Sequence, residues 1–282
     1  MVAPSGDTAA PRFRRAGFGA LGVLHVGGVL LPWWTGVDPS ALALCAALYL
    51  LQMFGVTAGY HRYFSHRSYE TGPGMRAFLA FLALSTLQRP VRWWAAKHRD
   101  HHRFSDGPDD VHSPAVHGVL RAHLTWPFYT DADTPAAHVN DLDRFPEIVW
   151  LDRYWRLPFA VLALASFLLL GWSGVVVGLV WSTLLVYHAT GSVNSLAHAF
   201  GWRRYATRDR SRNNGWLALA TLGEGWHNNH HHYPLSCRQG FFWWELDATW
   251  LVLRGLERIG LVWGLREAPA GVRGEGSARV ES

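Results

Sequence analysis

The stretch LPFAVLALASFLLLGWSGVVVGLVWSTLLVYHAT, residues 157–190, contains no charged side chain. A helix that crosses a membrane needs about 20 consecutive, mostly apolar residues. The stretch is long enough for two short helices of this kind, and its segment LGWSG, residues 170–174, carries glycines that favour a tight turn. We therefore expect two membrane-spanning helices, at about 155–170 and 174–197, joined by a hairpin.

Two further apolar runs lie nearer the N-terminus, at about 17–34 and 41–60. The first ends at Trp33 and Trp34, and tryptophan is enriched where a span meets the membrane surface. A shorter apolar run, residues 75–87, is predicted to be a re-entrant or interfacial helix because it is too short to cross a bilayer comfortably. The chain is thus predicted to have four spans.

Basic side chains are distributed unevenly around these spans. They precede the first span, recur between the second and third and follow the fourth, whereas the segments 35–40 and 170–174 contain none. Lysine and arginine accumulate on the cytoplasmic side of a membrane. We therefore predict that both termini are cytoplasmic, together with a helical cap formed by residues 61–154 and 198–266.

The predicted fold class is an all-α integral membrane protein whose single domain, residues 16–266, lies between disordered ends, residues 1–15 and 267–282. Of 26 basic residues only one is lysine, a composition typical of a GC-rich bacterium, so the expected location is the plasma membrane. The net charge of +5 favours anionic lipid, a CoA-like headgroup or an acidic partner protein, and we expect no nucleic-acid partner. Two cysteines are too few for a disulfide framework or a cysteine metal cluster.

Histidine is concentrated in the predicted cytoplasmic part of the chain. Four clusters stand out: HRYFSH at 61–66, HRDHH at 98–102, NSLAH at 194–198 and HNNHH at 227–231. Residues three and four positions apart share one face of a helix, so each HxxHH motif can direct three imidazoles into one cavity. The clusters together supply nine histidines and one asparagine.

Neutral imidazole is the commonest metal ligand in proteins, and one transition metal takes about four to six donors. Nine imidazoles therefore suit two ions. A structural zinc site would close with four ligands and would usually include cysteine. Carboxylate-bridged di-iron bundles need two Glu-x-x-His motifs, and this chain has the single pair Glu224 and His227. We infer a histidine-rich di-iron centre.

These residues resemble the membrane-bound fatty acyl desaturases of the stearoyl-CoA type. The resemblance rests on HRYFSH, HRDHHRFSD, NSLAHAFG and GEGWHNNHHHYP, in this order, and covers about residues 18–265. It implies an enzyme that uses O2 and two iron ions to introduce a cis double bond, at the delta-9 position, into a saturated acyl chain. Acyl-CoA is the expected carrier, with acyl carrier protein and phospholipid as open alternatives.

By the same resemblance, the metal ligands, which would also be the catalytic residues, are His61, His66, His98, His101, His102, His198, His227, His230 and His231. Asn194 would reach its iron through a water. The implied groups are His61, His66, His98, His102 and His231 on one iron and His101, His198, His227 and His230 on the other.

Six further side chains are expected to bind the substrate. Tyr49 and Met53 precede His61 by twelve and eight residues, so on a regular helix they share its face and could close the far end of an acyl tunnel. Ordinary packing of the span explains them as well. Trp93, Trp94, Lys97 and Arg99 surround the second cluster and could hold the acyl carrier, although tryptophans also suit a membrane interface.

The electrons would come from a partner protein. The chain has no dinucleotide-binding glycine motif after a strand and no cysteine cluster for iron and sulfur. A separate ferredoxin-like or cytochrome b5-like donor, with its reductase, is therefore implied on the basic cytoplasmic face.

Two other functions share part of this pattern. A histidine-rich di-iron hydroxylase or alkane monooxygenase uses the same metal ligands, and spacing alone does not exclude it. A metal transporter is the non-enzymatic alternative, although transporters place their ligands near the middle of the membrane and these clusters mostly lie beyond the ends of the spans.

Overall fold

The computed structural model describes residues 12–129 and 137–274. Within these ranges, three helical segments are long and apolar enough to cross a membrane: Arg15–Thr35, Pro39–Ser65 and Leu157–His198. The first consists of α1 (Arg15–Leu30) and α2 (Pro32–Thr35), and the second of α3 (Pro39–Phe54) and the π-helix η1 (Gly55–Ser65). The protein is therefore mostly helical, as the sequence predicted.

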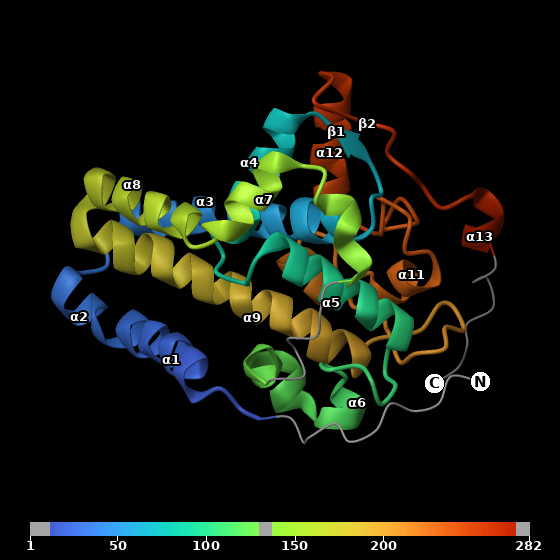
Figure 1. Cartoon of the computed structure of the whole chain (residues 1–282), viewed down its shortest axis with the longest axis horizontal. Coiled ribbons are helices and arrows are strands. Elements are labelled where there is room, and N and C mark those ends of the chain that lie inside the picture. Colours follow the sequence, from blue (N-terminus) through green and yellow to red (C-terminus); the bar gives the residue numbers. More distant parts are fainter. Residues whose placement is uncertain (1–11, 130–136, 275–282) are drawn as a thin grey trace.

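The third segment reverses direction at the turn predicted from LGWSG. It comprises α8 (Leu157–Ser173), the π-helix η6 (Gly174–Val180), α9 (Trp181–Ser195) and the 3-10 helix η7 (Leu196–His198). Within α8 the backbone leaves the helical region at Leu170 and at Gly171, where φ is 61°. A Cβ atom on Gly174 would lie 2.3 Å from the carbonyl oxygen of Ser166. Glycine thus permits the close return that places α8 beside α9 (Figure 1).

Shorter elements surround one end of these long helices (Figure 1). The α-helices are α4 (Pro73–Leu84), α5 (Val91–Phe104), α6 (Pro114–His117), α7 (Pro146–Arg153), α10 (Gly215–Ala220), α11 (His227–His232), α12 (Ala248–Arg258) and α13 (Ala270–Gly274). The other helices are η2 (Arg121–Thr125), η3 (Trp126–Phe128) and η5 (Ala137–Leu142). The strands β1 (Glu70–Thr71) and β2 (Val262–Trp263) form one antiparallel pair. We call this assembly of short elements the cap.

The π-helix η1 decides how the first histidine cluster is presented. Each turn of a π-helix is wider than that of an α-helix, because its hydrogen bonds join residues five apart. Accordingly, the backbone N–H of His66 donates to the carbonyl of His61 at 3.2 Å. The five-residue spacing of HRYFSH, which is out of phase on an α-helix, therefore brings both histidines to the same side.

Two ends of the domain differ from the expected boundaries. Residues 1–11 and 275–282 lie outside the described part of the chain, so the disorder expected for them remains a prediction. Residues 267–274, expected to be disordered as well, are described and include α13. Ala268 is buried against Tyr205 and Phe241, which gives this segment a small apolar anchor.

Candidate metal centre

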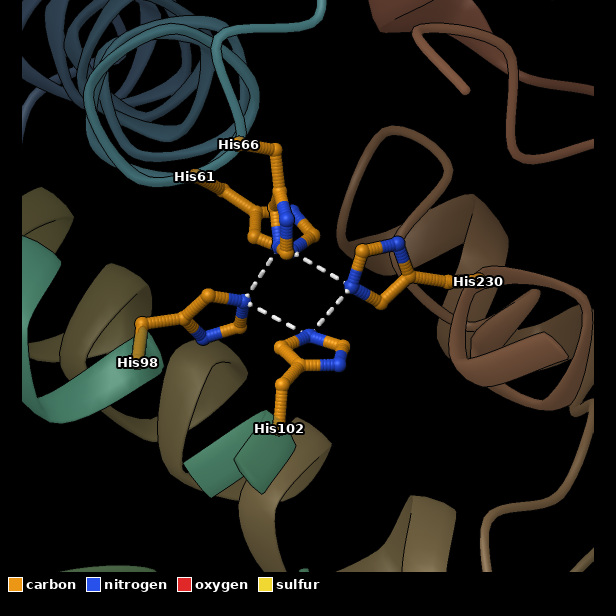
Figure 2. Close-up of side chains that lie close together, drawn as sticks. All are labelled: His61, His66, His98, His102 and His230. Carbon is orange, nitrogen blue, oxygen red and sulfur yellow. Dashed lines mark hydrogen bonds between the residues drawn. The ribbon is translucent and has the colours of Figure 1, made fainter. Parts of the chain in front are cut away.

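Five histidine rings from three separate elements converge on one point (Figure 2). His61 and His66 come from η1 and its end, His98 and His102 from α5, and His230 from α11. Successive Nε2 atoms lie 2.7 Å apart for His66 and His98, 3.0 Å for His98 and His102, 2.8 Å for His102 and His230, and 3.0 Å for His230 and His61. We call these residues the five-ring group.

Four other histidines form a second point of convergence beside the first. They are His101 from α5, His198 from η7, and His227 and His231 from α11, with ligand atoms within 4.8 Å of one another. The Nε2 atoms of His198 and His227 are 3.0 Å apart. We call these residues the four-ring group. All nine histidines singled out in the sequence thus lie in one of the two groups.

The grouping implied by the resemblance was wrong for two residues. It assigned His231 to the group of His61 and His230 to the group of His101, whereas the structure places His230 in the five-ring group and His231 in the four-ring group. The reason is the geometry of the HxxHH motif. Its first and fifth residues share a helical face, whereas its fourth and fifth are about 100° apart. Consequently α11 directs His227 and His231 to one group and His230 to the other.

The α5 helix divides its motif by the same rule. His98 and His102 point into the five-ring group, and His101 points into the four-ring group. Since α5 and α11 each contribute to both groups, the two motifs together form a shared wall between the two candidate sites.

Carboxylates hold the outer ring nitrogens of the four-ring group. The Nδ1 atoms of His101, His198 and His231 donate to Asp110 at 2.9 Å, to Asp106 at 2.8 Å and to Asp209 at 2.8 Å. In a neutral ring, such a bond holds the proton on Nδ1 and leaves the lone pair of Nε2 available to a metal. The Nε2 atom of His231 is buried and has no hydrogen-bond partner among the described residues. The four ring nitrogens that lie close together in this group could therefore donate their lone pairs to one bound cation.

The five-ring group has a different support. The Nδ1 atom of His61 contacts Glu224 and lies 3.2 Å from the amide nitrogen of Gln239. Glu224 also pairs with the buried guanidinium of Arg62 at 3.1 Å, and Arg62 in turn pairs with Asp247 at 2.9 Å. Glu224, the carboxylate that contacts His61, is therefore shared with an internal arginine.

The surroundings keep most of these rings neutral. Burial, together with the neighbouring imidazoles, holds the pKa of His66, His98 and His102 well below its ordinary value, and the same causes act on His227 and His230. Burial also lowers the pKa of His231, to about 4, although Asp209 opposes it. Neutral imidazole is the form that binds a metal.

His101 is the exception. Its burial would lower its pKa, but the charge of Asp110 and the hydrogen bond to it, with the charges of Asp106 and Asp209, outweigh burial and raise the pKa. The carboxylates themselves stay ionised. Burial raises the pKa of Asp106, but its bond to His198 and its other hydrogen bonds bring it down to about 2. The four-ring group is thus enclosed by negative charge.

The donor set fits iron. Two groups of four and five imidazole nitrogens, without a thiolate in either, suit divalent first-row metals, and a site of this kind keeps room for further ligands when an ion takes six donors. The outer hydrogen bonds to carboxylates are those that orient metal-binding histidines in general.

A cavity of about 810 Å³ adjoins the five-ring group. Its walls come from α1, α5, α8, α9 and the η2–η3 segment, and most of them are apolar. Trp93, Trp94 and Lys97, which the sequence analysis expects to bind the substrate, line this cavity, and His98 and Asn194 line it too. The cavity thus connects apolar walls with one ring of the candidate metal centre.

The other three expected substrate residues lie elsewhere. Arg99 donates to Asp141 at 2.8 Å and to the carbonyl oxygens of Phe64 and Ser65, so it ties α5 to η1. Met53 is fully buried in the core, and the Tyr49 hydroxyl donates to the Ala220 carbonyl at 2.6 Å. None of these three is among the described residues that line the cavity.

Sequence reasoning missed the residues behind the rings: Asp106, Asp110, Asp209, Glu224 and Gln239. A local signal existed for some of them. Asp106 and Asp110 occur in SDGPDD, directly after the second histidine cluster, and Glu224 occurs three residues before His227. Asp209 and Gln239 belong to loops with no histidine motif of their own, so only the fold identifies them.

Comparison with known proteins identifies relatives over most of the chain. The family model "Fatty acid desaturase" matches residues 38–264. The sn-2 palmitoyl-lipid 9-desaturase of Nostoc sp. (strain 36) is 36% identical over 257 residues, which cover 89% of this chain and 90% of the relative. The sn-1 stearoyl-lipid 9-desaturase of Anabaena variabilis is 35% identical over 249 residues, covering 87% and 91%. The acyl-CoA C20 Delta5-desaturase of Anemone leveillei is 35% identical over 223 residues, covering 77% and 71%.

Proposed function

The chain belongs to the fatty acid desaturase family, and we propose that it introduces a cis double bond, at the delta-9 position, into a saturated acyl chain in an O2-dependent reaction. The observation that carries this proposal is the largely apolar cavity whose wall includes His98. An acyl chain held in this cavity would lie against the five-ring group.

The nine histidines of the two groups would hold two iron ions, with Asn194 contributing through a water. When bound, these ions would supply the activation of dioxygen that removal of hydrogen from an unactivated methylene requires. The chain's own task is to position the acyl chain and to exclude water. Trp94, stacked on His98 at a ring-centroid distance of 5.2 Å, is placed to orient both the ring and the substrate.

Other residues of the cavity wall would exclude water from the metal centre. Trp93 stacks on Trp126 at 5.4 Å, and Trp126 stacks on His112 at 4.7 Å. His112 in turn lies against His101, with ring centroids 4.4 Å apart. This row of aromatic rings separates the cavity from the four-ring group and would limit the access of bulk water to the metal.

The proposed topology has four spans, because the third membrane-length segment turns back at Gly171. The reversal supports counting α8 as one span and η6 with α9 as another. The basic residues on the side of the cap support a cytoplasmic cap and cytoplasmic termini in a bacterial plasma membrane. The electron donor would be a ferredoxin-like or cytochrome b5-like protein that docks on this basic side.

For the acyl carrier we propose a membrane lipid in place of CoA. The names of the Nostoc and Anabaena relatives describe lipid-bound substrates. In addition, the cavity reaches the surface between the first turns of α1 and α8, where the exposed residues Arg15, Ala20, Arg156 and Ala160 line it. An opening between two spans, with arginines at the level of the headgroups, suits an acyl chain that enters from the bilayer.

Expression with a ferredoxin and its reductase in a bacterial host tests the activity. Double bonds in the extracted fatty acids are mapped by derivatisation and mass spectrometry. We expect a new double bond that is absent from His231→Ala but retained in the matched variant His232→Ala, since His232 stacks on Tyr205 at 3.9 Å outside both groups. A hydroxylated product instead of an alkene would refute the proposal.

The carrier is tested separately with purified enzyme in membranes. Stearoyl groups are supplied either as phospholipid in the bilayer or as stearoyl-CoA, each isotopically labelled. Label in unsaturated phospholipid before it appears in any CoA ester supports the lipid carrier. Conversion of stearoyl-CoA alone would overturn it while leaving the desaturase activity in place.

A further inference from the structure

Outside the long helices, six large apolar side chains lie on the surface around the buried Trp226. They belong to α10, to the segment that precedes it and to the loop before α12: Trp202, Trp216, Leu219, Trp243, Trp244 and Leu246. Trp216 is 85% exposed and Trp243 is 87% exposed. We call these six residues the aromatic patch.

Trp226 joins the parts of this patch. Its ring lies 5.9 Å from that of Trp202, and its Nε1 donates to the carbonyl of Leu246 at 2.8 Å. A Cβ atom on Gly215, the first residue of α10, would touch the same indole ring at 3.7 Å. Trp226 thus contacts all three segments that carry the exposed side chains and holds these segments next to one another.

The depth of α10 is set by its contact with a membrane-length helix. The hydroxyl of Tyr49 donates to the carbonyl of Ala220, the last residue of α10, at 2.6 Å. Tyr49 lies within α3, in the interior of the segment Pro39–Ser65 that is apolar enough to cross a membrane. An element bonded to a membrane-length helix is held close to the bilayer, so the exposed tryptophan and leucine of α10 are placed to reach its surface.

The chemistry of the patch and its border points to lipid. A soluble surface rarely exposes so many large apolar groups together, and tryptophan prefers the region where acyl chains meet headgroups. Arg212 borders the patch: it is positioned by its bond to the Gly201 carbonyl at 3.2 Å, next to Trp202. Aromatic groups with an arginine at their edge are typical of an element lying in the membrane interface.

We propose that α10 and the loop at residues 242–246 are inserted in the membrane interface and anchor the cap to the bilayer outside the spans. The partner is the lipid surface, with anionic headgroups near Arg212. The anchor has a direct link to the metal centre, because Trp226 immediately precedes His227 of the four-ring group. The support of the patch and the start of α11 are therefore adjacent residues.

Nitroxide labels can measure this immersion in the full-length, metal-loaded protein. Trp216→Cys and Trp243→Cys are labelled separately and placed in bilayer nanodiscs of phosphatidylcholine and phosphatidylglycerol. The native Cys45 and Cys237 are buried, so a reagent for exposed thiols reaches the introduced cysteine, and unlabelled background is measured on the unsubstituted chain. Accessibility to O2, which enters the bilayer, is compared with accessibility to a water-soluble nickel chelate.

Two matched positions calibrate the measurement. Leu168→Cys is on the exposed side of α8, and Glu70→Cys is exposed on β1, beyond the end of the Pro39–Ser65 segment. We expect the ratio of O2 to nickel accessibility at Trp216 and Trp243 to be several-fold higher than at Glu70 and to approach that at Leu168. A ratio equal to that at Glu70 overturns the proposal.

A different occupant gives a different signature. If an electron-donor protein or a second copy covered the patch, the label would be protected from both O2 and the nickel chelate, which also overturns the proposal. Neither result depends on catalytic turnover, because both labelled positions lie outside the metal ligands and outside the cavity wall. The outcome is therefore independent of the substrate and of the reaction.

Discussion

The five-ring group and the four-ring group share the helices α5 and α11, but they differ in what lies behind the rings. Three carboxylates, Asp106, Asp110 and Asp209, accept hydrogen bonds from the four-ring group. Behind the five-ring group, Glu224 contacts His61 and is also an ion-pair partner of Arg62. The four-ring group is therefore the more anionic of two sites that use the same kind of ligand.

The two groups also differ in their position, because the less anionic five-ring group is the one that adjoins the cavity. The cavity is lined by His98 of the five-ring group, and among the described residues no member of the four-ring group lines it. We infer a division of labour: the five-ring group faces the substrate, and the four-ring group, surrounded by carboxylates, stabilises positive charge at a distance from it. The group with fewer imidazoles thus has more carboxylates behind its rings.

Removal of one ring from each group is the strongest test of this difference. We expect both His66→Ala and His198→Ala to lose desaturation completely. Iron content should separate them: His198→Ala should fall from about two ions per chain to about one, since three imidazoles remain where a metal takes about four to six donors. His66→Ala leaves four imidazoles and should retain more iron.

Iron per chain is measured by elemental analysis on purified protein, and double bonds by mass spectrometry. His232→Ala, next to a ligand but outside both groups, controls for nonspecific damage to α11. Equal iron loss in His66→Ala and His198→Ala would contradict the distinction between a five-ligand and a four-ligand site.

Removal of the supporting charge should have a smaller effect. Asp209→Asn keeps an oxygen acceptor near Nδ1 of His231 but removes the negative charge. Loss of such an outer partner typically weakens metal binding about 10–100-fold, and we expect a loss in this range. Competition with a calibrated chelator measures it.

The counterpart in the other group is Glu224→Gln. Because Glu224 is also a partner of the buried Arg62, we expect this variant to lower the thermal stability of the protein in addition to any effect on iron. If Asp209→Asn lowers the melting temperature of the metal-free protein as much as Glu224→Gln does, the aspartate is a structural residue and the comparison fails.

Much of this centre was predictable from spacing. The apolar stretches and the LGWSG segment located the long helices and their reversal, and two HxxHH motifs identified rings that lie together. The spacing of HxxHH already implies that His227 and His231 share a face and that His230 lies on another, but which group each face meets depends on how the short helix α11 is placed between the two groups. The role of HRYFSH also required the structure, since only a π-helix brings residues five apart to one side.

The carboxylates and the cavity depend still more on tertiary structure. Asp209 reaches His231 from a loop that has no local pattern of its own. Likewise, the wall of the cavity combines α1 with residues more than a hundred positions later in the chain. The length of the cavity could therefore not be predicted from the positions of two residues on α3. The expected chain-length residues Tyr49 and Met53 illustrate the difficulty, because neither is among the described residues that line the cavity.

The smallest expected effect concerns the cavity that reaches the five-ring group. Leu184 lies near the start of α9, far along that helix from Asn194, and lines the cavity, whereas its neighbour Leu185 is 53% exposed and points away from it. We expect Leu184→Trp to fill the far end and to shift the products toward shorter acyl chains, with little change in iron content. Leu185→Trp is the matched control and should leave the chain-length profile unchanged.

Met53 provides the complementary change at the same end. The cavity residue Thr183 accepts a hydrogen bond from Gln52 at 3.0 Å, and Gln52 directly precedes Met53. Met53 is the next residue of the same helix and is fully buried, so we expect Met53→Ala to leave space on this side of the cavity and to admit longer chains. Opposite shifts for Leu184→Trp and Met53→Ala would show that the acyl chain extends from His98 toward the start of α9, whereas an unchanged profile in both would place the substrate outside this cavity.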